Sequence, residues 1–449
     1  MCNVSKGMSL NWLERERNMR LRKDNAALQP PMGWNSWDCF AAGVTEKQLL
    51  DNAAGLAQLK SCGWEYVVCD IQWSEPLAAS EKNQGVVYRK FAPLTLDAWG
   101  RQIPAPNRFP SSADGKGFAP IAEKIHAMGL KFGIHIMRGI PRQAVHERLP
   151  IFGTNATADE AARPDSICCW NGDMYGVDPA SAAGQAYYDS IFQLYADWGV
   201  DFVKVDDICH EHLYVDDPYG AAEVEMIRRA IDKAGRPMCL SLSPGPAVIE
   251  KAWHLEHYAN MWRITDDFWD DWKLLLDMFD RCELWQGHGK PGCWPDCDML
   301  PLGKIGTGFG QPRKPNFTHA EQRTLMTLWC IFRSPLIMGG DLTQLDDWTR
   351  SLLTNEKILA AQQTGREPEQ MERDEKHAVW TSLTQEGGRY LALFNLDNKT
   401  QTVSVSLSDL EFDVRSAEDL WGDTPATLSG SCIQAELPAH GAGMYLLQK

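Results

Sequence analysis

Short apolar runs alternate with longer amphipathic segments over most of the chain. The apolar runs predict strands buried on both faces, as in parallel sheets, at 32–34, 66–70, 131–136, 202–205, 238–242, 261–265, 294–299 and 336–338. Apolar residues at helical spacing predict helices between these strands, at 45–60, 118–128, 183–198, 221–233, 270–283 and 319–332.

Strands that alternate with helices usually pair in parallel through right-handed crossovers. About eight such units predict an α/β fold, a (β/α)8 TIM barrel, rather than an open doubly wound sheet. An open sheet usually carries a glycine-rich phosphate loop after its first strand, and the sequence after 32–34 has no such loop.

The pattern changes after about residue 355, where the helical spacing stops. Short β-like runs separated by turn sequences follow at 378–383, 390–396, 402–407, 431–437 and 444–447. They predict a small antiparallel β-sandwich. We therefore expect an N-terminal leader (1–29), a (β/α)8 barrel (30–360) and a C-terminal antiparallel β domain (361–449).

Composition narrows the choice of partners and setting. The formal net charge of -16 disfavours nucleic acid or an anionic membrane as partner, because like charges repel. The leader is polar and lacks the apolar centre of a signal peptide, and no apolar run is long enough to span a membrane. The 13 cysteines, an odd number in a long chain, predict free thiols in a reducing, cytoplasmic setting. The 18 tryptophans favour stacking on sugar rings, although they could also simply fill the core.

Polar residues stand at the ends of most predicted strands. The strand at 202–205 delivers Lys204, Asp206 and Asp207. Polar residues at the other strand ends are Asp70, His135, Arg138, Ser241, Ser243, Arg263, Asp266, Asp267, Asp296 and Asp298. In a barrel these ends converge on one face, so the side chains are expected to share one pocket. Any one of them could cap a helix, but capping does not account for so many strand ends.

Several carboxylates in one pocket suit glycoside hydrolysis, which needs one carboxylic acid and one base or nucleophile. The same residues could instead hold a divalent cation. Lys204 and Arg263 would oppose a cation, and they would keep a neighbouring nucleophilic carboxylate ionised by lowering its pKa. Cys168-Cys169 and Cys209-His210-Glu211-His212 could bind zinc, but their spacing matches no standard zinc pattern. We expect neither a metal nor a cofactor.

At these motifs the chain resembles glycoside hydrolase family 27, the melibiase-like family of α-galactosidases and α-N-acetylgalactosaminidases. The motifs that carry the resemblance are Pro30-Pro31-Met32-Gly33-Trp34-Asn35, Lys204-Val205-Asp206, Trp262-Arg263, 292–299 and 334–342. The resemblance implies a barrel followed by an antiparallel β domain. It also implies a retaining double displacement on an oligosaccharide or glycan, without a cofactor.

The resemblance also implies roles for single residues. Asp206 matches the nucleophile and Asp267 the general acid/base, whereas Asp266, the alternative, has the wrong spacing from Arg263. Residues that the resemblance places in the substrate-binding site are Trp34, Asp70, Trp73, His135, Lys204, Ser243, Arg263 and Asp298.

Two departures from the family pattern bear on the sugar. Asp70-Ile71 stands where galactose-specific members have two aspartates, which removes an acceptor for a sugar hydroxyl. Ser241-Leu242-Ser243-Pro244 replaces a Cys-Glu-Trp-Pro sequence, and Ser243 resembles members that accommodate an N-acetyl group. We expect hydrolysis of terminal α-galactosyl residues. The alternatives are an α-N-acetylgalactosaminidase, a β-L-arabinopyranosidase, an α-glucan hydrolase or a non-catalytic carbohydrate-binding protein.

Overall fold

The computed structural model describes residues 23–449 apart from 79, 82–84, 90, 215–216 and 411–412. Most of the predicted leader, residues 1–22, lies outside the described residues. The described part of the leader packs on the barrel: Lys23 is only 2% exposed, and its Nζ donates to the carbonyls of Ala259 (3.0 Å) and Gly292 (3.1 Å). The barrel's contacts therefore begin before residue 30.

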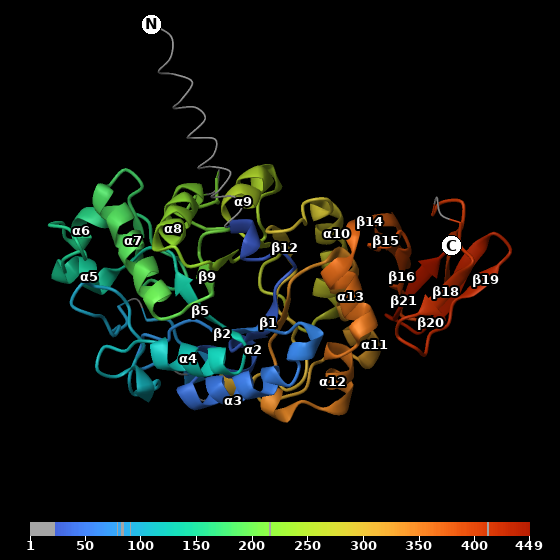
Figure 1. The fold of residues 1–449 in the computed structure, drawn as a ribbon, viewed down its shortest axis with the longest axis horizontal. Helices are drawn as coiled ribbons and strands as arrows, with labels where there is room; N and C mark the ends of the chain where they lie inside the picture. Colours follow the sequence, from blue (N-terminus) through green and yellow to red (C-terminus); the bar gives the residue numbers. More distant parts are fainter. Residues whose placement is uncertain (1–22, 79, 82–84, 90, 215–216, 411–412) are drawn as a thin grey trace, which may run out of the picture.

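Within the described residues, eight parallel strands curl into a barrel, which confirms the predicted fold (Figure 1). In spatial order they are β12 (Trp294–Asp296), β11 (Met261–Arg263), β10 (Cys239–Leu242), β9 (Phe202–Asp206), β5 (Lys131–Met137), β2 (Tyr66–Cys69), β1 (Met32–Asn35) and β13 (Leu336–Met338). Leu300, just beyond β12, pairs with Met338 of β13, so backbone hydrogen bonds also join the two ends of the sheet.

Helices on the outside of the barrel connect successive strands (Figure 1). They are α3 (Glu46–Ala57), α4 (Ala119–Ala127), α7 (Ala182–Asp197), α8 (Ala221–Ala234), α9 (Ala252–Tyr258), α10 (Trp272–Trp285) and α11 (His319–Phe332). The apolar pattern of the sequence does not predict α9, because seven residues are too few to show the periodic spacing of apolar residues that marks a helix. The predicted strand at 294–299 ends early because Asp298 has a left-handed φ of 76°, which no strand residue adopts.

Shorter elements lie in the loops and after the last barrel strand. They are α2 (Trp37–Phe40), β3 (Ser80–Glu81), β4 (Gly85–Val86), β6 (Ile140–Pro141), α5 (Arg142–Glu147), α6 (Ala158–Ala161), β7 (Ala162–Arg163), β8 (Met174–Val177), α12 (Asp347–Leu353) and α13 (Glu356–Thr364).

The C-terminal part is an antiparallel sandwich beside α11 and α13 (Figure 1). One sheet contains β14 (Arg366–Arg373), β15 (His377–Leu383), β16 (Arg389–Asn395), β21 (Ala442–Gln448) and β18 (Ser416–Asp419). The other contains β17 (Gln401–Ser406), β20 (Cys432–Leu437) and β19 (Thr427–Ser429). Because α13 ends at Thr364, the expected domain boundary at residue 360 falls inside this helix.

Apolar side chains close the N-terminal end of the barrel. Tyr66, Val68, Phe202, Cys239, Met261 and Trp294 form one buried cluster with Ala27. The Trp294 indole donates to the Ala27 carbonyl at 2.7 Å, so the leader covers this end. The open space of the barrel therefore lies at the carboxyl ends of its strands, where barrel enzymes bind their substrates.

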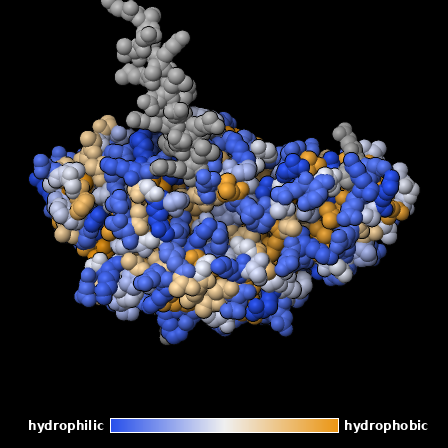
Figure 2. Space-filling model, in the orientation of Figure 1, coloured by the Kyte–Doolittle hydropathy of each residue, from blue (hydrophilic) through white to orange (hydrophobic). Residues whose placement is uncertain are grey.

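The surface is largely polar on the face that Figure 2 shows, with apolar residues scattered among hydrophilic ones. Among the described residues, no helix has the length and apolar character needed to cross a membrane.

Replacing Lys23 with alanine tests whether the leader belongs to the barrel. The change leaves the buried Ala259 carbonyl without its side-chain donor and removes one of the two side-chain donors of the Gly292 carbonyl, which should lower the free energy of unfolding by about 1–3 kcal/mol. Urea unfolding measures this loss as a lower midpoint. Lys47→Ala is the control, because that side chain is 83% exposed on α3 and should change stability by only about 0.5 kcal/mol. Equal effects of the two changes would contradict a structural role for Lys23.

Candidate active site

A cavity of about 480 Å³ opens at the carboxyl ends of the barrel strands. Its deeper polar part is formed by Asp38, Asp70, Lys204, Asp206, Arg263 and Asp298. Aromatic residues that line it are Trp37, Tyr88, Trp170, Phe268, Trp269 and Phe309. Such a mixture of charged groups and flat apolar surfaces suits a sugar.

Strand β9 directs Lys204 and Asp206 into this cavity. Successive side chains of a strand point to opposite faces, so these two residues share a face while Val203 and Val205 pack outward against the helices. Lys204 Nζ donates to Asp70 Oδ2 at 3.2 Å, and Asn35 Nδ2 donates to the same oxygen at 2.7 Å.

Asp206 is held as a carboxylate. Its Oδ2 lies 3.1 Å from Nε2 of His135, on the neighbouring strand β5. Burial alone would raise the pKa of Asp206, but the hydrogen bond from His135 and the charges of Lys204 and Arg263 hold it well below its usual value. Because an ionised Asp206 can only accept, the His135 Nε2 carries the proton that it donates.

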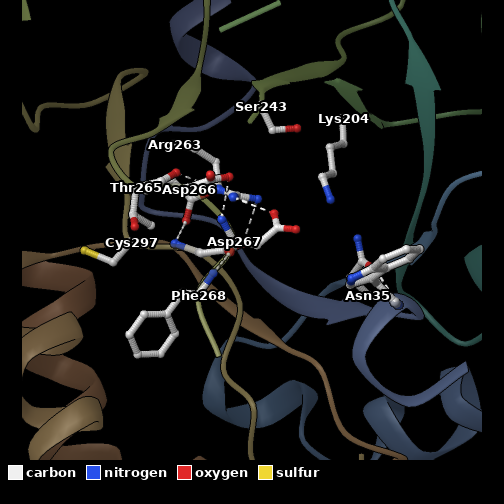
Figure 3. Close-up of polar contacts among 12 residues, drawn as sticks. Asn35, Lys204, Ser243, Arg263, Thr265, Asp266, Asp267, Phe268 and Cys297 are labelled. Carbon is white, nitrogen blue, oxygen red and sulfur yellow. Dashed lines mark hydrogen bonds and ion pairs between the residues drawn. The ribbon is translucent and has the colours of Figure 1, made fainter. Parts of the chain in front are cut away.

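Arg263 at the end of β11 joins two further carboxylates. Its guanidinium donates to Asp267 Oδ1 at 2.8 Å and lies 3.2 Å from Asp298 Oδ1. The Asp267 side chain is 61% exposed, whereas Arg263 and Asp298 are buried. Figure 3 shows Arg263 and Asp267 on one side of the site and Lys204 on the other. Asp267 can therefore reach both the cavity and its mouth.

Six of the predicted site residues meet at the cavity: Asp70, Lys204, Asp206, Arg263, Asp267 and Asp298. Asp266, the alternative to Asp267, also lines it. His135 lies behind the wall and reaches the site through Asp206. Ser243 is completely buried, its hydroxyl donates to the Val205 carbonyl at 3.4 Å, and the next residue, Pro244, lines the cavity in its place.

The structure corrects the positions of two predicted wall residues. Trp34 and Trp73 are buried in the core, where their indoles donate to the carbonyls of Gly340 (2.8 Å) and His135 (2.6 Å). Trp34 points away from the cavity because of the alternation along β1. Trp37, three residues later and beyond the strand, faces the cavity.

The candidate zinc ligands do not converge. Nδ1 of His210 lies 2.9 Å from the Pro246 carbonyl, Glu211 pairs with Arg138 at 3.0 Å, and Cys209 is buried. Among the described residues, no group of three or more histidine, cysteine, aspartate or glutamate side chains is arranged to hold a metal ion.

A buried ion network supports the turn after β9, and sequence reasoning missed it. Asp207 has a left-handed φ of 59°, and its carboxylate lies 3.0 Å from the Arg138 guanidinium. The same guanidinium lies 3.0 Å from Glu211 and 3.1 Å from Glu223. Burial raises the pKa of Asp207 to about 6 and that of Glu211 to about 7. The charge of Arg138 opposes this shift only in part, because it is shared among three carboxylates.

Comparisons with known proteins agree with this architecture. Residues 172–364 match the family model described as Alpha galactosidase A, and residues 374–447 match that of the alpha galactosidase C-terminal beta sandwich domain. A GH27 β-L-arabinopyranosidase from Geobacillus stearothermophilus is 53% identical, with a TM-score of 0.91 over 95% of this chain and 98% of that one.

Two further relatives have other names. A Bacillus halodurans protein, provisionally named an α-N-acetylgalactosaminidase, is 49% identical, with a TM-score of 0.83 over 94% of this chain and 98% of that one. The alpha-galactosidase of Cyamopsis tetragonoloba is 25% identical over 95% of this chain and 88% of its own length.

The Arg138 network predicts that stability depends on pH. The raised pKa of Glu211 means that the folded protein keeps a proton that the unfolded chain, with a pKa of about 4.3, releases. Stability should therefore fall as the pH rises from about 4.3 to about 7. In Glu211→Gln the fall between pH 5 and pH 8 should be smaller by on the order of 1–3 kcal/mol.

Urea unfolding at several pH values measures this slope. Glu250→Gln, a change at an exposed position, is the control and should keep the parent's slope. An unchanged slope in Glu211→Gln would show that this carboxyl does not titrate differently in the folded protein.

Proposed function

The chain belongs to glycoside hydrolase family 27, and on that premise we propose that it is a retaining exo-glycosidase for terminal sugars of the galacto configuration. Within this class we propose β-L-arabinopyranose as the preferred sugar. This pentose has the ring stereochemistry of α-D-galactopyranose but lacks its hydroxymethyl group. The α-D-galactosyl residue is then the related hexose substrate.

Asp206 is the nucleophile in this proposal. Its ionised oxygen attacks the anomeric carbon while the bond from that carbon to the leaving oxygen breaks. Asp267 gives its proton to the leaving oxygen. Water then attacks the anomeric carbon, Asp267 takes a proton from the water, and the bond to Asp206 breaks. Two inversions retain the configuration. The burial of Asp206 and the exposure of Asp267 support this division of roles.

Ile71 is the residue that determines the preferred sugar in this proposal. It lines the cavity beside Asp70, is 3% exposed, and packs in an apolar cluster with Met137, Cys168 and Met174. A sugar hydroxyl group that lay against Ile71 would give up its hydrogen bonds to water and find no partner in the protein. The lost hydrogen bonds would strongly disfavour a substrate that carries this hydroxyl group. A pentose has one hydroxyl fewer to satisfy. The 53% identity to a β-L-arabinopyranosidase supports the same choice.

The cavity mouth suits an oligosaccharide or glycan. Phe309 lies edge-to-face with Trp37 (ring centroids 5.5 Å apart) and with Trp269 (5.7 Å apart), so aromatic side chains extend the cavity wall beyond its charged residues. We also propose a reducing, cytoplasmic setting. The cysteines of the described residues are free thiols, and most of them are buried, which supports this setting.

Azide rescue tests the role of Asp206. Asp206→Gly should lower kcat by on the order of 10⁴-fold or more, because the covalent intermediate cannot form. Added azide fills the space, attacks the anomeric carbon and should yield a glycosyl azide of inverted configuration. Product analysis by NMR identifies it. Full activity of Asp206→Ala without azide would exclude Asp206 as the nucleophile.

A panel of nitrophenyl glycosides tests the sugar. The parent should have a higher kcat/KM for the β-L-arabinopyranoside than for the α-D-galactoside. Ile71→Asp restores an acceptor and should shift this ratio toward the galactoside by about tenfold or more. Ile71→Leu, which stays apolar, should keep the parent's ratio. A parent that prefers the α-galactoside or the α-N-acetylgalactosaminide would overturn the proposed preference.

A further inference from the structure

The carboxyl group of Asp38 lies in the cavity wall and has no part in the mechanism above. Asp38 belongs to α2, which begins two residues after β1, and it lines the cavity together with Trp37. It is 2% exposed, and its Oδ2 has no hydrogen-bond partner among the described residues. A buried polar oxygen without a partner destabilises a fold, so its presence calls for an explanation.

The other buried carboxylates of the cavity all have partners. Asp70 accepts from Asn35 and Lys204, and Asp206 accepts from His135. Asp298 accepts from the backbone N–H of Phe268 at 2.8 Å and pairs with Arg263. Asp38 therefore differs from its neighbours in the same cavity: its Oδ2 is turned toward Gly339 and has no partner among the described residues, while the residue as a whole lines the cavity.

The fold keeps space for this carboxyl group. Gly339 follows β13, the strand that pairs with β1, and a Cβ at this glycine would lie 2.0 Å from Asp38 Oδ2. The φ of Gly339 is not in the left-handed region, so its backbone conformation does not require glycine. The absence of a side chain at 339 is instead what allows the Asp38 carboxyl group to occupy its place.

We propose that Asp38 is a further substrate-binding residue, whose carboxyl group forms a hydrogen bond with a hydroxyl group of the terminal sugar. This proposal rests on the proposed function, because it takes the same sugar in the same cavity. The charged neighbours of Asp38 include Asp298, Lys204, Asp267, Asp70 and Arg313. It thus lies among the groups that bind the sugar and protonate the leaving oxygen.

The surroundings also determine the form of the carboxyl group. Burial, followed by the charge of Asp298, raises the pKa of Asp38 well above its usual value, although Lys204 opposes the shift. A neutral carboxyl group has one O–H donor and retains acceptor oxygens. It can therefore donate to one sugar oxygen and accept from another, which neither Lys204 nor an ionised Asp70 can do.

Removing the carboxyl group should separate binding from stability. In Asp38→Ala, the affinity for free L-arabinose, measured by calorimetry, and kcat/KM for the β-L-arabinopyranoside should both fall at least tenfold. The melting temperature should stay the same or rise, because an unpaired buried oxygen is gone. Asp38→Asn keeps the shape and both hydrogen-bonding capacities, and its losses should be smaller than those of Asp38→Ala.

Asp341→Ala is the matched control. Asp341 is also buried, at 5% exposure, but its carboxylate accepts from Thr343 and Gln344. This change should lower the melting temperature and leave the sugar affinity within twofold of the parent. Gly339→Ala, which displaces the Asp38 carboxyl group, should weaken sugar binding as Asp38→Ala does. The double variant should bind the sugar no more weakly than Asp38→Ala alone, because both changes remove the same contact.

The outcomes distinguish the two proposals. If the parent binds L-arabinose and Asp38→Ala binds it equally well, or if Asp38→Ala loses only melting temperature, the role of Asp38 is overturned while the proposed function stands. If the parent binds the sugar but hydrolyses no glycoside of the panel, the proposed function fails while the role of Asp38 is still decided by the affinities. A parent that binds neither L-arabinose nor D-galactose overturns both proposals.

Discussion

Two cations, the partly buried Lys204 and the buried Arg263, hold the carboxylates of the cavity in place. Lys204 donates to Asp70 and stands beside Asp206, and Arg263 contacts both Asp267 and Asp298. Buried carboxylates without a compensating charge take up protons, because the low dielectric penalises the ionised form. The low pKa of Asp206 therefore depends on these cations and on His135, and so does the nucleophilic role that we propose for it.

The register of the barrel strands places these charged side chains next to one another. His135 of β5 and Ser241 of β10 stand directly beside Lys204 of β9, while β11 brings Arg263 to the same edge. Side chains from strands far apart in the chain thus meet within hydrogen-bonding distance. The N-terminal end of the barrel is filled with apolar side chains and covered by Ala27, so these polar groups face the open end.

The periodicity of the chain was enough to predict the eight strands, the sandwich and the convergence of Asp70, Asp206, Asp267 and Asp298. It failed where a strand ends and the chain turns. Trp34 and Trp37 stand in one short motif, but Trp34 lies on the outward face of β1, whereas Trp37 begins α2 beyond the strand and lines the cavity. Asp38 and the Arg138 network were missed because their significance depends on hydrogen-bond partners, which distant segments such as β13 and α8 provide or withhold.

The proposed catalytic residues and the residues proposed to select the sugar follow different strands of the barrel. Substrate preference can therefore differ between family 27 barrels that share one reaction mechanism. Asp206 and Asp267 come from β9 and β11, whereas Asp38 and Ile71 follow β1 and β2, which are neighbours on another part of the wall. Ile71 places an apolar side chain in the wall after β2, and Asp38 places a carboxyl group in the wall after β1. His135 and Arg263 hold the carboxylates of Asp206 and Asp267. The hydroxyl pattern that the cavity accepts can therefore vary at Ile71 and Asp38 while these contacts of the proposed catalytic pair remain.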